Sequence, residues 1–225
     1  MSKILIPAQS PEDWKQFLAE PEKHWKKGFS ARSLAYCWQK ADGIPSDVLE
    51  VLSQVSSLKN LKTVFAIPEH KVPLPGGSAP SQNDVWVLAE TKETLISITV
   101  EGKVSEPFGP SVGEWYQSKT SGKEKRLRFL CTELGLSFPP PPQLRYQLLH
   151  RTVSAVIEAK RFRTNEAVMV VHSFSRSNEW VEDYKYFLSL FGLNGEVNKA
   201  VSVAIPNGIN LSFAWVHGEA NCLQS

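Results

Sequence analysis

The chain has 225 residues, of which 42% are hydrophobic and 21% charged, a composition that excludes a wholly disordered protein. Its 25 basic and 23 acidic residues give a net charge of +2, which excludes a polybasic protein but leaves room for a local basic groove. No apolar run reaches about 18 residues, and only a short one precedes Pro7, so we expect no membrane span, no signal peptide and a cytoplasmic location.

The N-terminal part of the chain predicts three helices. Serines mark their starts near Ser10, Ser30 and Ser46, because a serine side chain can cap the free N–H groups of a first turn. The second helix ends before Gly43, and the third extends over residues 46–57 with apolar residues at helical spacing.

Strands dominate the next segment. Residues 62–67 predict a strand, and the proline- and glycine-rich residues 68–83 predict a long loop. Strands over 84–90 and 95–104 follow, rich in β-branched residues and separated by the turn at 91–93. Their short connection predicts an antiparallel hairpin.

The rest of the chain alternates helices and strands. After a mixed region that ends in four consecutive prolines, the patterns predict helices over 126–134, 143–163 and 179–191 and strands over 167–172, 201–205 and 211–216. The strands at 95–104 and 167–172 are joined through a helix, which favours a right-handed crossover and a parallel pair.

The fold class that follows is mixed α/β (α+β), with a mixed sheet flanked by helices. We expect the helix over 143–163 on one face of the sheet and the helix over 46–57 on the other. The chain is interpreted as a single domain: an N-terminal helical extension (1–45), a core (46–175) and a C-terminal helix and hairpin (176–225).

One charged pair in this core has the residue types of a catalytic site. Glu101 and Lys103 end the second hairpin strand, and the two-residue period of a strand puts them on one face with Ser97 and Thr99. Asp84 begins the other hairpin strand, so the antiparallel arrangement brings it to the same end of the sheet.

Two carboxylates beside a lysine suit a hard divalent cation, Mg²⁺ or Mn²⁺, because such ions prefer oxygen ligands and need few of them from the protein. A metal ion there would polarise a phosphoryl oxygen and activate a water, and Lys103 would orient that water or stabilise negative charge. Gly102, without a side chain, lets the backbone approach the ion.

Asp84, Glu101-Gly102-Lys103 and the order helix, three strands, helix, strand resemble the PD-(D/E)xK phosphodiesterase superfamily, which has the restriction-endonuclease-like fold. The resemblance covers residues 46–175 and implies that Asp84 and Glu101 hold Mg²⁺ while Lys103 assists the attacking water. It departs at Asn83, where the family's namesake proline would stand.

Other members of that superfamily suggest further site residues. Some add an acid from the first core helix, for which Glu50 or Asp47 is the candidate, and some carry a glutamine on the crossover helix, for which Gln147 is the candidate. The chain as a whole also looks like an uncharacterised bacterial domain family.

Plainer interpretations stand beside these. Glu101 and Lys103 can be a solvated pair at a strand end, and the helix face that carries Gln147, Arg151 and Glu158 can be a surface face. The rival tripeptide Glu90-Thr91-Lys92 lies in the hairpin turn and is expected to be exposed.

Nucleic acid is the expected partner if the site is catalytic. The basic runs 119–128 and 160–163 can follow phosphates, and Trp115 and Tyr116 can stack on bases, although solvated loops and core packing are the plainer roles. Nothing in the sequence indicates a membrane partner or an oligomer.

The three cysteines, Cys37, Cys131 and Cys222, have no paired spacing, which argues against a disulfide framework and a Cys-x-x-Cys metal site. We interpret Cys37 and Cys131 as small buried apolar residues.

The sequence therefore predicts a Mg²⁺-dependent phosphodiesterase, in particular a nuclease, with Asp84, Glu101 and Lys103 as its catalytic residues. The alternative is a non-catalytic module on the same fold that binds nucleic acid or protein. A third hypothesis is an unrelated α/β domain that binds a small ligand under the loop at 68–83.

Overall fold

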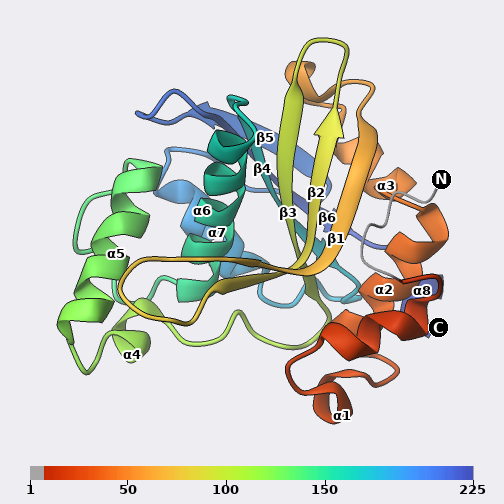
Figure 1. Ribbon diagram of the computed structural model, residues 1–225, viewed down its shortest axis with the longest axis horizontal. Helices are drawn as coiled ribbons and strands as arrows, with labels where there is room; N and C mark the ends of the chain where they lie inside the picture. The colour runs from red at the N-terminus through yellow and green to blue at the C-terminus, as the bar shows by residue number, and fades with distance from the viewer. Residues whose placement is uncertain (1–7, 225) are drawn as a thin grey trace.

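A mixed six-stranded sheet forms the centre of the protein, with helices against both of its faces (Figure 1). The computed structural model describes residues 8–224, so the short apolar stretch before Pro7 lies outside the described residues. In spatial order the strands are β1 (Lys62–Val72), β2 (Ser81–Glu90), β3 (Leu95–Lys103), β4 (Glu166–Ser173), β6 (Asn210–His217) and β5 (Lys199–Ala204). The β1–β2, β2–β3 and β5–β6 pairs are antiparallel, whereas β3–β4 and β4–β6 are parallel. The expected hairpin and the expected parallel crossover pair are both confirmed.

Two groups of helices enclose the sheet. The first face packs against α2 (Ser30–Ala41), α3 (Ser46–Leu52) and α8 (Ala220–Gln224). A 3₁₀ helix (Pro11–Phe17) and α1 (Pro21–His24) come before α2 in the chain. The second face packs against α5 (Ser121–Leu134), α6 (Tyr146–Arg161) and α7 (Val181–Ser189), together with the single turn α4 (Val112–Trp115). The crossover helix and the 46–52 helix therefore lie on opposite faces, as predicted (Figure 1).

Alternation along β3 divides the core in two. Ile96, Ile98 and Val100 point into the apolar core formed with α2 and α3. Ser97, Thr99, Glu101 and Lys103 share the opposite face, as the two-residue period predicts. The crossover helix α6 covers this face, as expected of the 143–163 helix, and the Thr99 hydroxyl donates to the Arg151 carbonyl oxygen at 3.1 Å. The polar residues of β3 are consequently buried.

Half of the expected long loop over 68–83 is strand, and the loop itself is limited to residues 73–80. β1 continues through Pro68 to Val72, which an edge strand permits because its outer N–H groups need no partner in the sheet. The remaining connection is fastened to α5, since the Arg126 guanidinium donates to the carbonyl oxygens of Pro75 at 2.9 Å and Gly77 at 3.2 Å. The hypothesis of a ligand beneath a long loop therefore loses half of the loop that it required, and the other half is held against α5.

Several helix boundaries also differ from prediction. The third helix ends at Leu52, and a 3₁₀ turn (Ser56–Leu58) replaces its expected last turn. The helix expected over 126–134 begins earlier, at Ser121, because the Thr120 side chain accepts the N–H of Lys123 and caps it. Among the described residues, none of the helices has the length and apolarity needed to cross a membrane.

Candidate active site

The β2–β3 hairpin places an aspartate and a glutamate at the same end of the sheet. Val85 pairs with Val100 in the antiparallel register, so Asp84 and Glu101 follow directly at that end. Asp84 Oδ2 accepts the backbone N–H of Gly102 at 2.8 Å, which joins the start of β2 to the end of β3. The predicted convergence of Asp84 and Glu101 is present.

Glu101 is the centre of a buried ionic network. Its Oε1 accepts hydrogen bonds from Lys103 Nζ at 2.8 Å and Gln147 Nε2 at 2.7 Å, and its Oε2 accepts one from Arg151 Nε at 2.6 Å. The side chains of Glu101 and Lys103 are only 3% and 4% exposed, which excludes the solvated surface pair that was the plainer interpretation. Lys103 also lies over the Phe108 ring, 4.8 Å from its centroid.

The crossover helix α6 supplies two members of this network. Gln147, the glutamine expected on this helix as a site candidate, accepts a hydrogen bond from Lys103 Nζ at 3.3 Å through its Oε1. Arg151, one turn further along α6, reaches Glu101 and also lies 3.9 Å from Asp84 Oδ1. The interpretation of this helix face as a surface face is therefore wrong, because α6 packs directly over β3. Glu158 on the same face is also buried, with its Oε1 2.9 Å from Arg161 Nη1 and 3.3 Å from His70 Nε2.

A third carboxylate, from β1, was not predicted. Glu69 lines the same cleft as Asp84 and Glu101, and its Oε2 accepts from Gln82 Nε2 at 2.7 Å. Its backbone adopts a left-handed conformation with φ of 52°, which interrupts the regular strand at this point. The acid-x-Lys pattern of Glu69 and Lys71 was visible in the sequence, but it fell in the segment interpreted as a loop.

The charges of the cluster divide its carboxylates into two kinds. Burial opposes ionisation of Glu101, but the charges of Arg151 and Lys103 outweigh it and lower the Glu101 pKa to about 2. Burial, together with the charge of Glu101, raises the pKa of Asp84 to about 7. Burial and the charge of Asp84 raise the pKa of Glu69 to about 8. In this cluster Glu101 is therefore neutralised by the neighbouring cations Arg151 and Lys103, whereas Asp84 and Glu69 are not neutralised in this way.

These groups line a cleft of about 440 Å³. The N-terminal segment also lines this cleft, with Phe29 and Ser30 at the start of α2, and Glu106 holds that segment by accepting the Ser30 N–H at 2.8 Å. The acidic side chains offer oxygen atoms, which Mg²⁺ and Mn²⁺ prefer as ligands. Because Asp84 and Glu69 have no short ion pair within the described residues, the donor set fits a hard divalent cation.

Comparison with protein-family models identifies the family of this chain. Residues 7–220 match the model of DUF6946, described as a domain of unknown function. The chain belongs to the DUF6946 family. Searches of curated proteins and of solved structures found no match. The family description carries no activity, so the geometry of the site is what bears on function.

The first core helix of this DUF6946 chain does not supply an acid to the site. Glu50 is exposed on α3, and α3 packs against β5 and β6 rather than against the Asp84 end of the hairpin. Asp47 instead contacts His172, with Oδ2 3.2 Å from Nε2. Both expectations for a third acid are therefore wrong, and Glu69 from β1 lies in the cleft instead.

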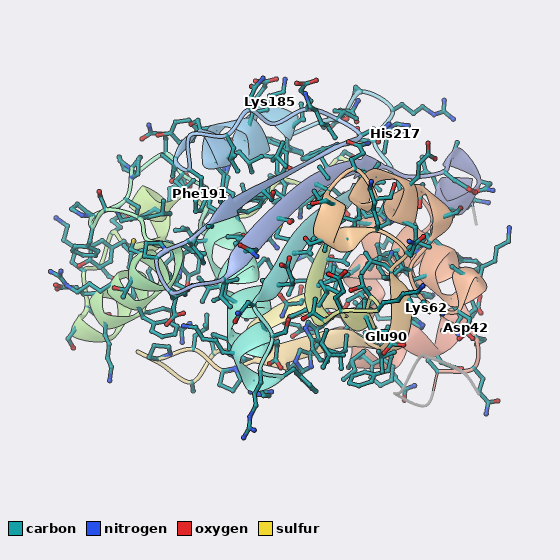
Figure 2. The ribbon with its side chains drawn as sticks, turned by 90° about the horizontal axis from the view of Figure 1, so that it is seen from above. Asp42, Lys62, Glu90, Lys185, Phe191 and His217 are labelled. Atoms are coloured by element: carbon teal, nitrogen blue, oxygen red, sulfur yellow. The ribbon has the colours of Figure 1, made fainter. Side chains whose placement is uncertain are left out.

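The rival tripeptide and the expected aromatic pair lie apart from the cluster. Glu90 pairs with Lys62 at the opposite end of the hairpin, where both side chains are exposed (Figure 2). Trp115 stacks on the Tyr146 ring of α6 with centroids 4.0 Å apart, and Lys123 Nζ of α5 lies 5.3 Å from the centroid of the Trp115 ring. This packing favours a structural role for Trp115.

Proposed function

We propose that this protein is a Mg²⁺-dependent phosphodiester hydrolase that acts on nucleic acid, related to the PD-(D/E)xK superfamily. The observation that carries the proposal is the convergence of Asp84, Glu101 and Lys103 with Gln147 in one cleft. The strand order β1-β2-β3-β4, with a helix between the parallel strands β3 and β4, adds support, since it is the arrangement that the resemblance to this superfamily implies.

Asp84, Glu101 and Glu69 are the residues that would hold the metal ion. When bound, the ion supplies Lewis acidity toward a phosphoryl oxygen and lowers the pKa of a coordinated water. The protein's own side chains contribute by holding the reacting groups in position. Gln147 fixes both the Lys103 ammonium and the Glu101 carboxylate, so Lys103 is held where it can donate to an attacking water or to a phosphate oxygen.

Arg151 has a second role in this proposal. Its guanidinium neutralises Glu101 and lies 3.9 Å from Asp84, so it allows three carboxylates to remain together before the metal ion arrives. It also brings a further positive charge to the cleft wall, where a phosphodiester would be attracted.

One observation favours the alternative, a non-catalytic nucleic-acid-binding module. Both oxygens of Glu101 are already engaged by Lys103, Gln147 and Arg151, so this carboxylate is satisfied without a metal ion. A site that had lost catalysis but kept its fold would retain this kind of internal neutralisation.

Calorimetric titration of Mg²⁺ and Mn²⁺ into the wild type and Asp84→Asn tests the proposal. The asparagine keeps an acceptor for the Gly102 N–H, so the variant should fold while losing a metal ligand. Exposed Glu93→Gln in the hairpin turn is the matched control. We expect divalent binding in the wild type and the control, with a loss of at least tenfold in Asp84→Asn.

Cleavage of labelled single- and double-stranded DNA and RNA, with and without Mg²⁺, completes the test. Metal-dependent cleavage that disappears in Asp84→Asn supports the hydrolase. Oligonucleotide binding without metal binding, retained in Asp84→Asn, would instead identify the non-catalytic module. Repeating the calorimetry with oligonucleotide present covers a metal site that the substrate phosphate completes.

A further inference from the structure

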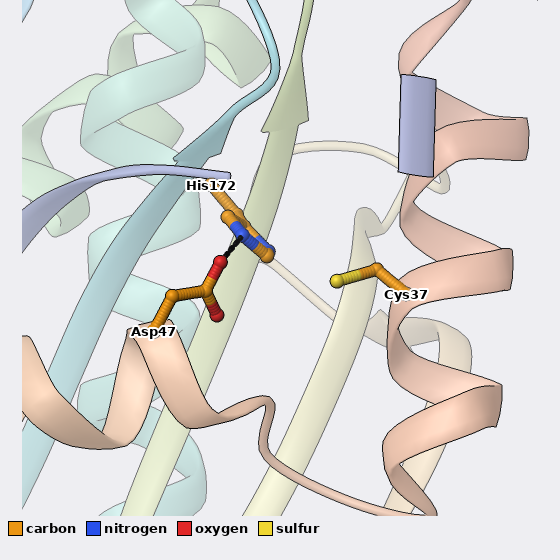
Figure 3. A group of neighbouring side chains, drawn as sticks. All are labelled: Cys37, Asp47 and His172. Carbon is orange, nitrogen blue, oxygen red and sulfur yellow. Dashed lines mark hydrogen bonds and ion pairs between the residues drawn. The ribbon is translucent and has the colours of Figure 1, made fainter. Parts of the chain in front are cut away.

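A second group of chemically active side chains lies on the other face of the sheet. Cys37 from α2, Asp47 from α3 and His172 from β4 have their sulfur, oxygen and nitrogen atoms within 4.8 Å of one another (Figure 3). Cys222 from α8 lies against Cys37, and both line one small surface cleft. The residue types are those of a transition-metal site or of a thiol pair.

The hydrogen bonds of His172 argue against the metal site. The Trp38 indole N–H can only donate, and it points at His172 Nδ1 at 3.1 Å, so Nδ1 is the unprotonated nitrogen. The proton is then on Nε2, which donates to Asp47 Oδ2 at 3.2 Å. A metal ion on Nε2 would move that proton to Nδ1, where it would meet the Trp38 N–H. Both nitrogens of His172 are therefore already committed.

With the metal site set aside, the thiol pair is the remaining interpretation of this group. Cys37 and Cys222 are both free and both line a cleft of about 170 Å³, which gives a reagent an approach from solvent. They come from the N-terminal and C-terminal parts of the chain, and each belongs to the same apolar core. We propose that Cys37 and Cys222 form a reversible disulfide that joins α2 to α8, by exchange with a low-molecular-weight disulfide such as oxidised glutathione.

The two thiols differ in a way that orders the exchange. The hydrogen bond from Cys37 lowers the pKa of Cys222, whereas the same contact and burial raise that of Cys37. Cys222 is accordingly the attacking thiolate, since the thiolate is the reactive form. It breaks the S–S bond of oxidised glutathione, forms a mixed disulfide and releases one glutathione thiolate, which takes the proton lost by Cys222.

The second exchange closes the bond. Cys37 loses its proton and attacks the Cys222 sulfur of the mixed disulfide, which expels the second glutathione as a thiolate that takes up this proton. In sum, two protein thiols are oxidised to one disulfide while one oxidised glutathione is reduced to two thiols. Excess dithiothreitol reverses both steps.

The disulfide would be linked to the cleft through α2. Phe29 and Ser30, at the start of this helix, line the wall of the candidate active site, and Cys37 lies two turns further along the same helix. A bond from Cys37 to α8 would therefore hold one end of the helix that borders the cleft. It would also close a chain loop of well over 100 residues, a length for which disulfides stabilise folded proteins strongly.

The test uses the full-length protein incubated with oxidised glutathione, then alkylated under denaturing conditions and weighed intact. We expect one alkylated cysteine in place of three, no attached glutathione, reversal by dithiothreitol and a melting temperature raised by about 5 °C or more. Cys37→Ser and Cys222→Ser should each abolish the bond. Cys131→Ser, which alters a buried cysteine on the other face, should keep it.

Three results would overturn the proposal. The first is three alkylated cysteines after treatment, which would mean that the thiols do not pair. The second is a glutathione that stays attached to Cys222. The third is stoichiometric Zn²⁺ binding by the reduced wild type that is lost in Cys37→Ser, which would show that Cys37 belongs to a metal site and that a metal ion can displace the Nε2 proton of His172.

Discussion

Replacing Arg151 with methionine tests the description of the ionic network directly. The Arg151 Nε lies 2.6 Å from Glu101 Oε2, and the two side chains are 9% and 3% exposed. Removing one partner of such a buried pair leaves an uncompensated charge and costs about 3–5 kcal/mol. Glu101 keeps Lys103 and Gln147 on its other oxygen, so we expect a loss near the lower end, about 3 kcal/mol.

Arg128→Met is the matched control. Arg128 pairs with Glu124 at 2.8 Å, a distance close to that in the buried pair, but these side chains are 57% and 42% exposed. An exposed pair of this kind contributes about 0.3–0.5 kcal/mol. Urea unfolding at pH 7 with a chelator present, followed by tryptophan fluorescence, measures the free energy of unfolding of both variants on one scale.

The same pair of variants also tests the metal site. Without Arg151, Lys103 is the one lysine or arginine among the described residues that line the cleft of Asp84, Glu101 and Glu69, so a divalent cation should replace the missing positive charge. Mg²⁺ is therefore expected to restore more unfolding free energy to Arg151→Met than it adds to the wild type. The reasoning is refuted if Arg151→Met costs no more than the Arg128 control. A Mg²⁺ effect equal in both proteins would refute the assignment of the cation site alone.

Two further predictions concern buried groups on either face of the sheet. Burial and the charge of Asp84 raise the Glu69 pKa, so the folded protein binds this proton more tightly than the unfolded chain and loses stability as the pH rises from about 4.5 to about 8. In the absence of metal, Glu69→Gln should therefore raise the melting temperature at pH 8.5 and change it little at pH 4.5. An increase in melting temperature that is equal at both pH values, or that the control Glu93→Gln also shows, would contradict this prediction. Trp38→Phe should lower the free energy of unfolding in urea by about 1–3 kcal/mol, because His172 Nδ1 is then buried without a hydrogen-bond donor. An unchanged unfolding midpoint would mean that this hydrogen bond is not formed.

The arrangement within the hairpin was predictable because it is local. A two-residue side-chain period and a short turn are enough to put Glu101 and Lys103 on one face and Asp84 at the same end of the sheet. Backbone geometry over about 20 residues decides these relations, with little influence from the rest of the molecule. The helix covering that face was also predictable, since a crossover between parallel strands must pass over the sheet.

The partners of these residues were not predictable, because they depend on how distant elements pack. Whether Arg151 lies in solvent or binds Glu101 depends on the rotation of α6 over β3, and Glu69 entered the cleft only because β1 continued past Pro68. Glu50 was misplaced for the same reason, since nothing in its helix specifies which strands it will contact.

The sequence by itself determined the hairpin, the parallel pairing of its second strand with the strand after the crossover helix, and the acid-acid-lysine end of that hairpin. Only the tertiary structure decided which charges neutralise Glu101 and that Cys37 meets Cys222 from the far end of the chain. Short-range geometry is set by bond rotations within one segment. Long-range contacts are set by the packing of whole surfaces, to which each residue contributes little.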